Sequence, residues 1–480
     1  MIWPELSSLI APESMISSGS RDVVFPVAGW GNPGSNTMSL MGVSPVVDPA
    51  GWLISDFSGV RFERWNALTY RARRADNPDD DQTAGYSVIH VSTPLAGENL
   101  FLLVGGSESS SSTNIGFRRE KGQLNRNISE NHSWLGIRGR NRSWEYLISL
   151  GQNGYFRGAG EAAAVVKMNI RNEMSISIWG SRRAADDHVE IEYGSDRAEV
   201  IAPFSKYMYG IEWTGSVMSW PLGVRLQRRW GSGRRGEEPM HRLKPNPDMW
   251  LLDLRAGSPD GILLFSGGLG KGKHRAELLS QGLRYARFLL NDSRFWLRIA
   301  WNLSLHERPL QLWSGYTSTS MWGEGDLEFW PFTPAIIDLL GLRRRAVADL
   351  SVNVLSTGGR SWLLHSDLYQ IYLGIDMHHL WTTGEFESWE PLVLGLGRTN
   401  ILLDQLKLRS AQLLDLGVQC EISIAGGIGL QGGIAQLLPL AAQERKPEEG
   451  EPVQEPERRE KADVWGGLRW WMSLTFDLYH

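Results

Sequence analysis

The sequence has little cysteine, little charge imbalance and no multi-cysteine pattern. A single cysteine, Cys420, occurs in 480 residues, which excludes an intramolecular disulfide and any zinc or iron–sulfur site built from several cysteines. The formal net charge is −5, from 49 basic against 54 acidic residues, so the chain has no global positive field that would hold a polyanion. We therefore expect no nucleic-acid partner, no metal site and no cofactor.

Long apolar runs are also missing. A membrane helix needs about 18 or more consecutive apolar residues, and the longest uncharged run, 422–443, is interrupted by glycines, glutamines and a proline. The first residues contain no apolar core of signal length and no basic residue before Arg21. The sequence therefore predicts no helical membrane protein, and it shows no export signal.

Catalytic motifs are incomplete where they occur. Residues 267–273 match most of a phosphate-binding loop, but His274 stands where that loop has Ser or Thr, and no strand–helix setting surrounds it. We predict a glycine-rich turn there. His378 and His379 are adjacent, so on a strand they would point to opposite faces and could not share a metal. No Gly-x-Ser-x-Gly motif is present, and we expect no enzyme.

The dominant pattern in the chain is alternation of apolar and polar residues with a period of two. Residues 295–305 have apolar side chains at every odd position, and 468–478 repeat the form at even positions. Residues 166–178 predict a hairpin that turns at Asn172-Glu173. Further turns are predicted at 139–142, 258–261, 291–293 and 357–360.

Strand length and aromatic content indicate a membrane. A tilted membrane strand needs about 9–11 residues, whereas soluble strands usually have about 5 or 6. The longer predicted strands are 294–305, 346–355, 368–378, 415–425 and 467–479. The 22 tryptophans favour aromatic girdles at the membrane interfaces. The girdle candidates are Trp301, Trp313, Trp362, Trp381, Trp465 and Trp470.

These patterns predict an all-β fold, an antiparallel transmembrane β-barrel of about 14–18 strands. Charged and amide side chains on the polar faces would then line the lumen. The candidates are Arg225, Asp253, Arg255, Arg298, Asn302, Asp349, Asn353, Gln370, Asp376 and Glu421. Such mixed charge could select solutes, or it could form ion pairs that fill the interior and stiffen the wall.

Three segments depart from alternation. Residues 1–57 are rich in Ser, Gly and Pro and predict a plug-like or periplasmic segment ahead of the barrel at 58–480. Residues 318–341 predict a long loop with a short helix that begins at Thr333-Pro334. Residues 443–463 are charged and proline-rich and predict a disordered extracellular loop.

Two segments resemble known families. Residues 468–478 resemble the closing strand of bacterial outer-membrane β-barrel proteins, although the chain ends in Leu-Tyr-His rather than in Phe or Trp. Residues 35–52 are similar to the region before the first strand in the long-chain fatty acid transporter family, with Asp48 where that family has Asn. The second resemblance implies a hatch inside the barrel.

The function expected from these features is passive or gated passage of a solute, including a hydrophobic one, across a bacterial outer membrane. One alternative is a structural or docking barrel of a surface complex without an open pore, and another is a soluble β-rich binding protein. The expected partners are the lipid bilayer with lipopolysaccharide, the barrel-assembly machinery and subunits of a surface complex.

Overall fold

The computed structural model describes residues 59–477 with gaps. The gaps are 74–80, 98, 118–121, 154–158, 172–173, 186–187, 194–195, 202–203, 218–219, 234–240, 258–261, 281–282, 306–307, 328–344, 367, 387–407, 425–427, 445–462 and 465–467. The predicted plug at 1–57, the helix near 334 and almost all of the charged loop therefore lie outside the described residues. The first part of the predicted loop at 318–341 differs from the prediction: residues 318–327 belong to the strand Arg308–Leu327, because their polar side chains do not prevent backbone pairing across the sheet. Within the described part, no helix is long and apolar enough to cross a membrane.

Almost all of the described residues lie in β-strands. In chain order the strands are β1 (Gly59–Arg73), β2 (Asp81–Ala96), β3 (Leu100–Phe117), β4 (Gly122–Arg140), β5 (Trp144–Asn153), β6 (Ala159–Arg171), β7 (Met174–Ala185), β8 (His188–Tyr193), β9 (Asp196–Ile201), β10 (Phe204–Val217), β11 (Trp220–Gly233), β12 (His241–Ala256), β13 (Leu263–Ser280), β14 (Leu283–Leu305), β15 (Arg308–Leu327), β16 (Arg345–His365), β17 (Tyr369–Phe386), β18 (Leu408–Ile424), β19 (Ile428–Glu444), β20 (Asp463–Val464) and β21 (Leu468–Asp477).

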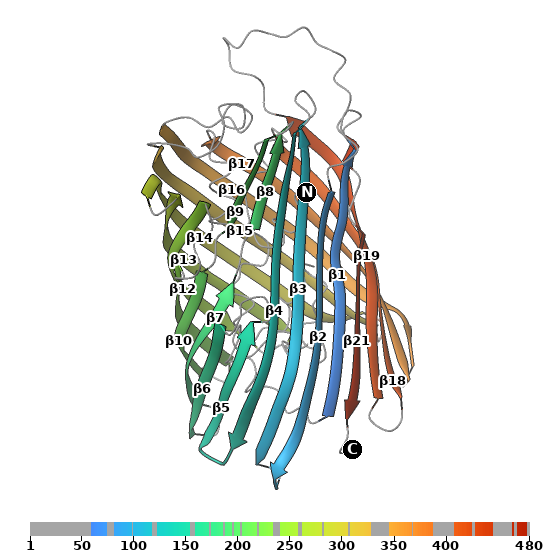
Figure 1. Ribbon diagram of the computed structural model, residues 1–480. Coiled ribbons are helices and arrows are strands. Elements are labelled where there is room, and N and C mark those ends of the chain that lie inside the picture. The colour runs from blue at the N-terminus through green and yellow to red at the C-terminus, as the bar shows by residue number, and fades with distance from the viewer. Residues whose placement is uncertain are drawn as a thin grey trace.

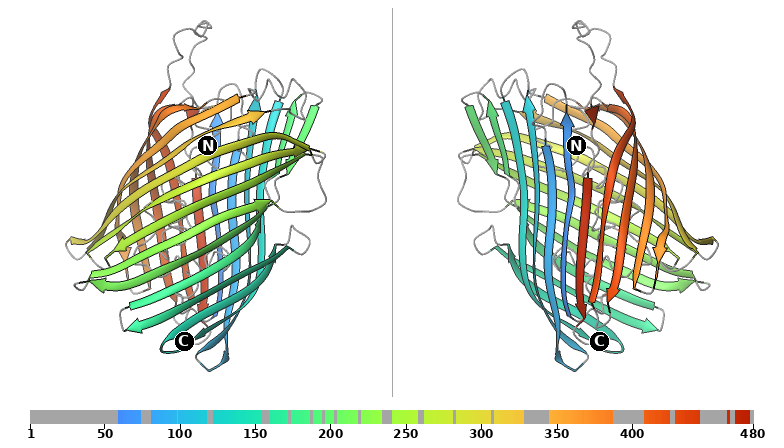
Figure 2. Two further views of the ribbon diagram at one scale, coloured as in Figure 1. Left: turned by 90° about the vertical axis from the view of Figure 1, so that its left-hand side faces the viewer. Right: turned by 90° about the vertical axis from the view of Figure 1, so that its right-hand side faces the viewer.

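The strands follow one another around an antiparallel barrel (Figures 1 and 2). Eighteen of the 21 strands form its wall, which falls within the predicted range. β8 and β9 are not part of this sequence of neighbours: they pair with each other, and β8 also pairs with the first residues of β4. β7 therefore pairs with β10. The last strand, β21, pairs with β19 on one side and with β1 on the other, so the two ends of the chain's sheet are neighbours.

The two ends of the barrel differ in their connections. At the end where β21 finishes, turns are tight: Asn141 Oδ1 accepts hydrogen bonds from the backbone N–H of Ser143 and of Trp144, at 2.9 and 2.7 Å. Ser366 makes a similar turn, its Oγ accepting from the N–H of Tyr369 at 3.1 Å. The connections that follow β15, β17 and β19 at the opposite end are much longer. Short turns at one end and long loops at the other are typical of bacterial outer-membrane barrels.

Each strand of the wall has an exposed and a buried face. In β5, Ile148 and Leu150 are 56 and 65% exposed, whereas Leu147 and Ser149, which alternate with them, are 0 and 1% exposed. The exposed face points out of the barrel and is apolar over most strands. Its members include Ile89, Leu135, Ile178, Ile211, Leu226, Leu254, Leu269, Leu297, Leu355, Leu373, Ile375 and Ile434. An apolar band of this extent suits a lipid environment and not water.

Several predicted turns are correct and others are wrong. The turn at 139–142 is confirmed, and β6 pairs antiparallel with β7 as the 166–178 hairpin requires. The predicted turn at 258–261 lies outside the described residues. Residues 291–293 and 357–360 are not turns: they lie in the middle of β14 and β16. The polar and glycine residues there are accommodated because every one is paired across the sheet, and Asn291 adds a side-chain hydrogen bond of 3.3 Å to the Trp322 carbonyl. β13 pairs antiparallel with β14 along its whole length, with Ser280 opposite Leu283.

The glycine-rich segment at 267–273 is also a strand and not a turn. Gly268 lies opposite Trp296, and a Cβ on Gly268 would come within 2.1 Å of the indole ring. The ring therefore occupies the space that a side chain would need. Three further buried tryptophans each lie opposite a glycine of the neighbouring strand in the same way. The pairs are Trp134 with Gly105, Trp179 with Gly210 and Trp313 with Gly358.

Candidate functional site: the inner wall of the barrel

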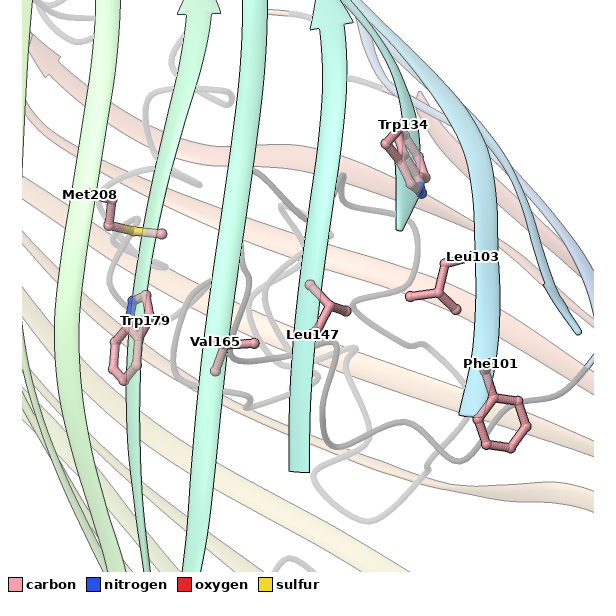
Figure 3. Packing of buried hydrophobic residues seen from close by; sticks show 7 residues of the cluster. All are labelled: Phe101, Leu103, Trp134, Leu147, Val165, Trp179 and Met208. Atoms are coloured by element: carbon pink, nitrogen blue, oxygen red, sulfur yellow. The ribbon is translucent and has the colours of Figure 1, made fainter. Parts of the chain in front are cut away.

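The buried faces of the strands together form the inner wall, and this wall has two chemically different parts. On β3–β7 and β10 it carries a cluster of apolar side chains, none more than 8% exposed, that we call the apolar sector (Figure 3). Its members are Phe101, Leu103, Trp134, Leu147, Val165, Trp179 and Met208. On β10–β18 the same face carries charge, and we call this part the charged sector. Its members are Glu212, Arg225, Asp253, Arg298, Arg360, Asp376, His378 and Glu421.

One polar pair is embedded beside the apolar sector. His132 Nδ1 lies 2.8 Å from Glu161 Oε2, and both side chains are almost fully buried. A buried carboxylate without a partner would be costly, so the histidine accounts for its presence on this face. The two residues are 29 positions apart in the chain and meet across β4, β5 and β6, which is why sequence patterns did not reveal them.

Arg225 is the centre of the charged sector. Its guanidinium donates to Glu212 Oε2 at 2.6 Å and lies 4.7 Å from the centroid of the Trp179 ring. Asp253 is the cross-strand neighbour of Arg225 on the other side. Glu212, Arg225 and Asp253 thus form a row of alternating charge across β10, β11 and β12.

A second polar group lies toward the end with short turns. The Arg360 Nε donates to Gln311 Oε1 at 2.6 Å, and its guanidinium lies 4.9 Å from the Tyr372 ring centroid. On the next strands, Glu421 Oε1 accepts from the amides of Gln419 and Gln431, at 2.8 and 2.9 Å. Amide donors from two strands, β18 and β19, therefore satisfy the inward carboxylate of Glu421.

Asp376 and His378 are the most deeply buried ionisable pair of this sector. Their side chains are 0% exposed, with Asp376 Oδ2 and His378 Nε2 3.6 Å apart. Gly358 leaves room for them, because a Cβ there would lie 2.8 Å from Asp376 Oδ1 and 2.7 Å from Trp313 Nε1. His379 lies on the other face and stacks on Trp381 at 5.3 Å, so the adjacent histidines point apart, as alternation predicts.

The structure places most of the predicted lumen residues on the inner wall. They are Arg225, Asp253, Arg255, Arg298, Asn302, Gln370, Asp376 and Glu421. Asn353 differs from the prediction: it lies on the outer face, where its Oδ1 accepts from the hydroxyl of Tyr316 at 2.9 Å, so it is buried under an aromatic ring and not in the lumen. Asp349 is described only by its strand position, opposite Trp322.

The predicted girdle tryptophans also divide between the outer face and the inner wall. Trp301, Trp381 and Trp470 share the outer face with exposed apolar neighbours. Trp313 differs from the prediction: it is 3% exposed and lies on the inner wall, because Gly358 opposite leaves a space for its ring. The Trp362 side chain and Trp465 lie outside the described residues. A tryptophan opposite a cross-strand glycine is the signal that would have identified the inward tryptophans, but it requires knowledge of the register.

The described part of the inner wall offers charged groups and hydrogen-bonding groups. Within the described residues, no cluster of three or more His, Cys, Asp or Glu could hold a metal ion. The arrangement can therefore bind and orient polar groups inside a barrel whose outside is apolar.

This architecture defines an antiparallel β-barrel of the bacterial outer-membrane type. No family model and no curated protein sequence matches the chain, so the resemblance to the fatty acid transporter family stays a prediction. Among solved structures, OprD of Pseudomonas aeruginosa is similar at 8% identity and a TM-score of 0.35, over 68% of this chain and 91% of OprD. CdiB from Acinetobacter baumannii has 10% identity and a TM-score of 0.34 over 87% of this chain, which spans 60% of CdiB. OmpT of Vibrio cholerae has 8% identity and a TM-score of 0.29, over 74% of this chain and 97% of OmpT.

Proposed function

We propose that the chain is an outer-membrane barrel that allows a solute to pass through its interior. One observation carries the proposal: strands whose outer face is apolar place ionisable groups such as Arg225, Asp253 and Asp376 on the opposite, inner face. Charged groups at membrane depth are costly unless they face water or a partner inside the protein. Groups of this kind along a pore determine which solutes pass.

The row Glu212, Arg225 and Asp253 supports selectivity for polar solutes. Carboxylates flank the guanidinium on both sides, so a solute that passes this row meets both signs of charge within two strands. The apolar sector lies close to the row, since the Arg225 guanidinium covers the ring of Trp179. A solute with one apolar and one charged part would find a surface for each.

The test is conductance of the purified, refolded chain in a planar lipid bilayer with a salt gradient. We expect discrete conductance steps and a reversal potential that shifts toward anion preference in Asp253→Asn, because one inward negative charge is removed. Asp248→Asn is the matched control: Asp248 is on the same strand but on the outer face, and its substitution should leave the reversal potential unchanged. A reversal potential that is the same in Asp253→Asn and in the unmodified chain would contradict the assignment of Asp253 to the pathway.

A second candidate has its own supporting observation. Inward residues such as Leu147, Asp376 and Gln419 are 0% exposed, which suits a barrel with a filled interior that serves as a structural or docking subunit. The same bilayer recording distinguishes the two functions, because a filled barrel would insert without producing conductance.

A further inference from the structure

The outer face of β10–β14 carries a group of cations that the proposed pathway does not use. Arg228, Lys271 and Lys273 are all on the outward register of their strands, and both lysines are exposed. Arg182 on β7 lies on the same face and is 6.0 Å from the Tyr207 ring centroid. We call these four residues the basic belt.

The strand register brings the belt together in two adjacent rows. Arg228 pairs with Trp250, Trp250 with Lys271, and Lys271 with Ser293. In the next row, Trp230 pairs with Asp248, Asp248 with Lys273, and Lys273 with Asn291. The first row therefore places an indole ring between two cations, and the second places Asp248 between an indole ring and a lysine.

The belt lies where the apolar outer band ends. From the end of the barrel with short turns, β11 presents Val224 and Leu226 before Arg228, and β13 presents Leu269 before Lys271. Aromatic rings mark the same level: Tyr207 stacks on Trp230 at 5.1 Å, and Tyr209 packs edge-on against Trp230 and Trp250 at 5.2 and 6.1 Å. Rings at this position are typical of the boundary between hydrocarbon and lipid headgroups.

The charge of the belt is only partly balanced. Asp248, the one carboxylate in the two rows, is held by Arg228, whose Nε and Nη2 donate to its two oxygens at 2.7 and 2.6 Å. Lys271 and Lys273 form no ion pair with any residue in the part of the chain that the structure describes. Two exposed ammonium groups thus remain, Lys271 opposite Trp250 and Lys273 opposite Asp248, toward the end of the barrel that carries the long loops.

We propose that the basic belt binds the phosphate groups of a phosphorylated glycolipid in the leaflet next to the long loops. The lysines contact the phosphates as point charges, the Arg228–Asp248 pair fixes the neighbouring rings, and Trp230 and Trp250 cover the sugar and upper acyl region. This inference rests on the membrane location in the proposed function and is independent of whether the interior conducts.

The experiment measures binding of bisphosphorylated lipid A to the full chain in neutral detergent by native mass spectrometry. Each lysine near an anionic lipid surface contributes about a factor of five in affinity, so Lys271→Gln with Lys273→Gln should weaken binding about thirtyfold. Lys167→Gln is the matched control, because Lys167 faces inward and pairs with Glu145 at 3.2 Å; it should bind lipid A as the unmodified chain does.

A second arm identifies the part of the lipid that is recognised. Lipid A without its phosphates should bind the unmodified chain as weakly as the phosphorylated lipid binds the double variant, and millimolar inorganic pyrophosphate should not displace the lipid. Equal binding of both lipids, or equal binding by the double variant and the unmodified chain, would overturn the proposal. Displacement by pyrophosphate would overturn it in favour of a site for a free anion. A gel band that still migrates faster when unboiled verifies that each variant is folded, and bilayer conductance tests the proposed function separately.

Discussion

The apolar and charged sectors of the inner wall occupy the same face of the same sheet and differ in almost everything else. Phe101, Leu103 and Leu147 belong to one cluster of buried apolar side chains, whereas Arg225, Arg360 and Asp376 lie beside specific polar partners. Arg225, Arg360 and Asp376 are buried as deeply as the apolar sector, at 0 to 2% exposure. The comparison shows that burial inside this barrel is achieved by packing on one side and by charge pairing on the other, so the same substitution should have different consequences in the two sectors.

The largest expected effect is in the charged sector. Arg225→Leu removes the partner of Glu212 and leaves a buried carboxylate beside Asp253, which typically destabilises a protein by about 3–5 kcal/mol. A urea titration followed by the unboiled band on a gel measures the free energy of unfolding. If Arg225→Leu lowered the free energy of unfolding no more than a surface substitution does, the interior at Arg225 would be open to water. That result would favour an open pathway.

The apolar sector should respond through packing. Leu147→Ala leaves a cavity at a position that is 0% exposed and should cost about 2–5 kcal/mol. Ile148→Ala, the next residue, points outward and is the control, because lipid can fill the space that it vacates. If both variants lost the same free energy of unfolding in the urea titration, Leu147 would not be packed as a core residue is.

A smaller effect is expected where a glycine makes room for an indole. Gly268→Ala would place a Cβ 2.1 Å from the Trp296 ring and 2.3 Å from the Leu252 carbonyl, and should cost about 1–3 kcal/mol. Gly223→Ala has nothing nearer than 3.9 Å around its Cβ and should be neutral. Tryptophan fluorescence should shift in Gly268→Ala alone, since only there must an indole move.

The smallest expected effect is on the outer face. Arg228→Leu removes an ion pair whose side chains are 34 and 41% exposed, and a pair of this kind contributes little to stability. The unfolding midpoint should stay within the error of the unmodified chain. Arg225→Leu, three residues away on the opposite face, provides the contrast. If both variants lost a similar free energy of unfolding, charged residues on the inner and outer faces would contribute equally to stability, and the proposed difference would be wrong.

Prediction of the fold from the sequence succeeded where one face of a strand is polar, because alternation in segments such as β14 and β21 indicates a barrel. Arg225, Asp253 and Asp376 lie on the polar faces of their strands, and their lining of a solute pathway stays a prediction. Alternation failed in β16, where Asn353 is polar and yet faces outward under Tyr316. In β5 both faces carry leucine or isoleucine, so alternation could not say which side is buried. The polar and glycine residues at 291–293 and 357–360 suggested turns because a single sequence does not reveal that they are paired across the sheet.

The sequence by itself determined the fold class, since period-two alternation over long segments with many aromatic residues specifies strands with one lipid-compatible face. The same alternation puts Arg225, Asp253 and Asp376 on the polar faces of their strands, but it did not single out Glu212, Arg360 or Glu161. The tertiary structure alone decided which of them meet: His132 with Glu161, Arg225 with Glu212 and Trp179, and each inward tryptophan with its glycine. The reason is physical: these contacts depend on strand register, and a shift by one residue turns every side chain to the other face.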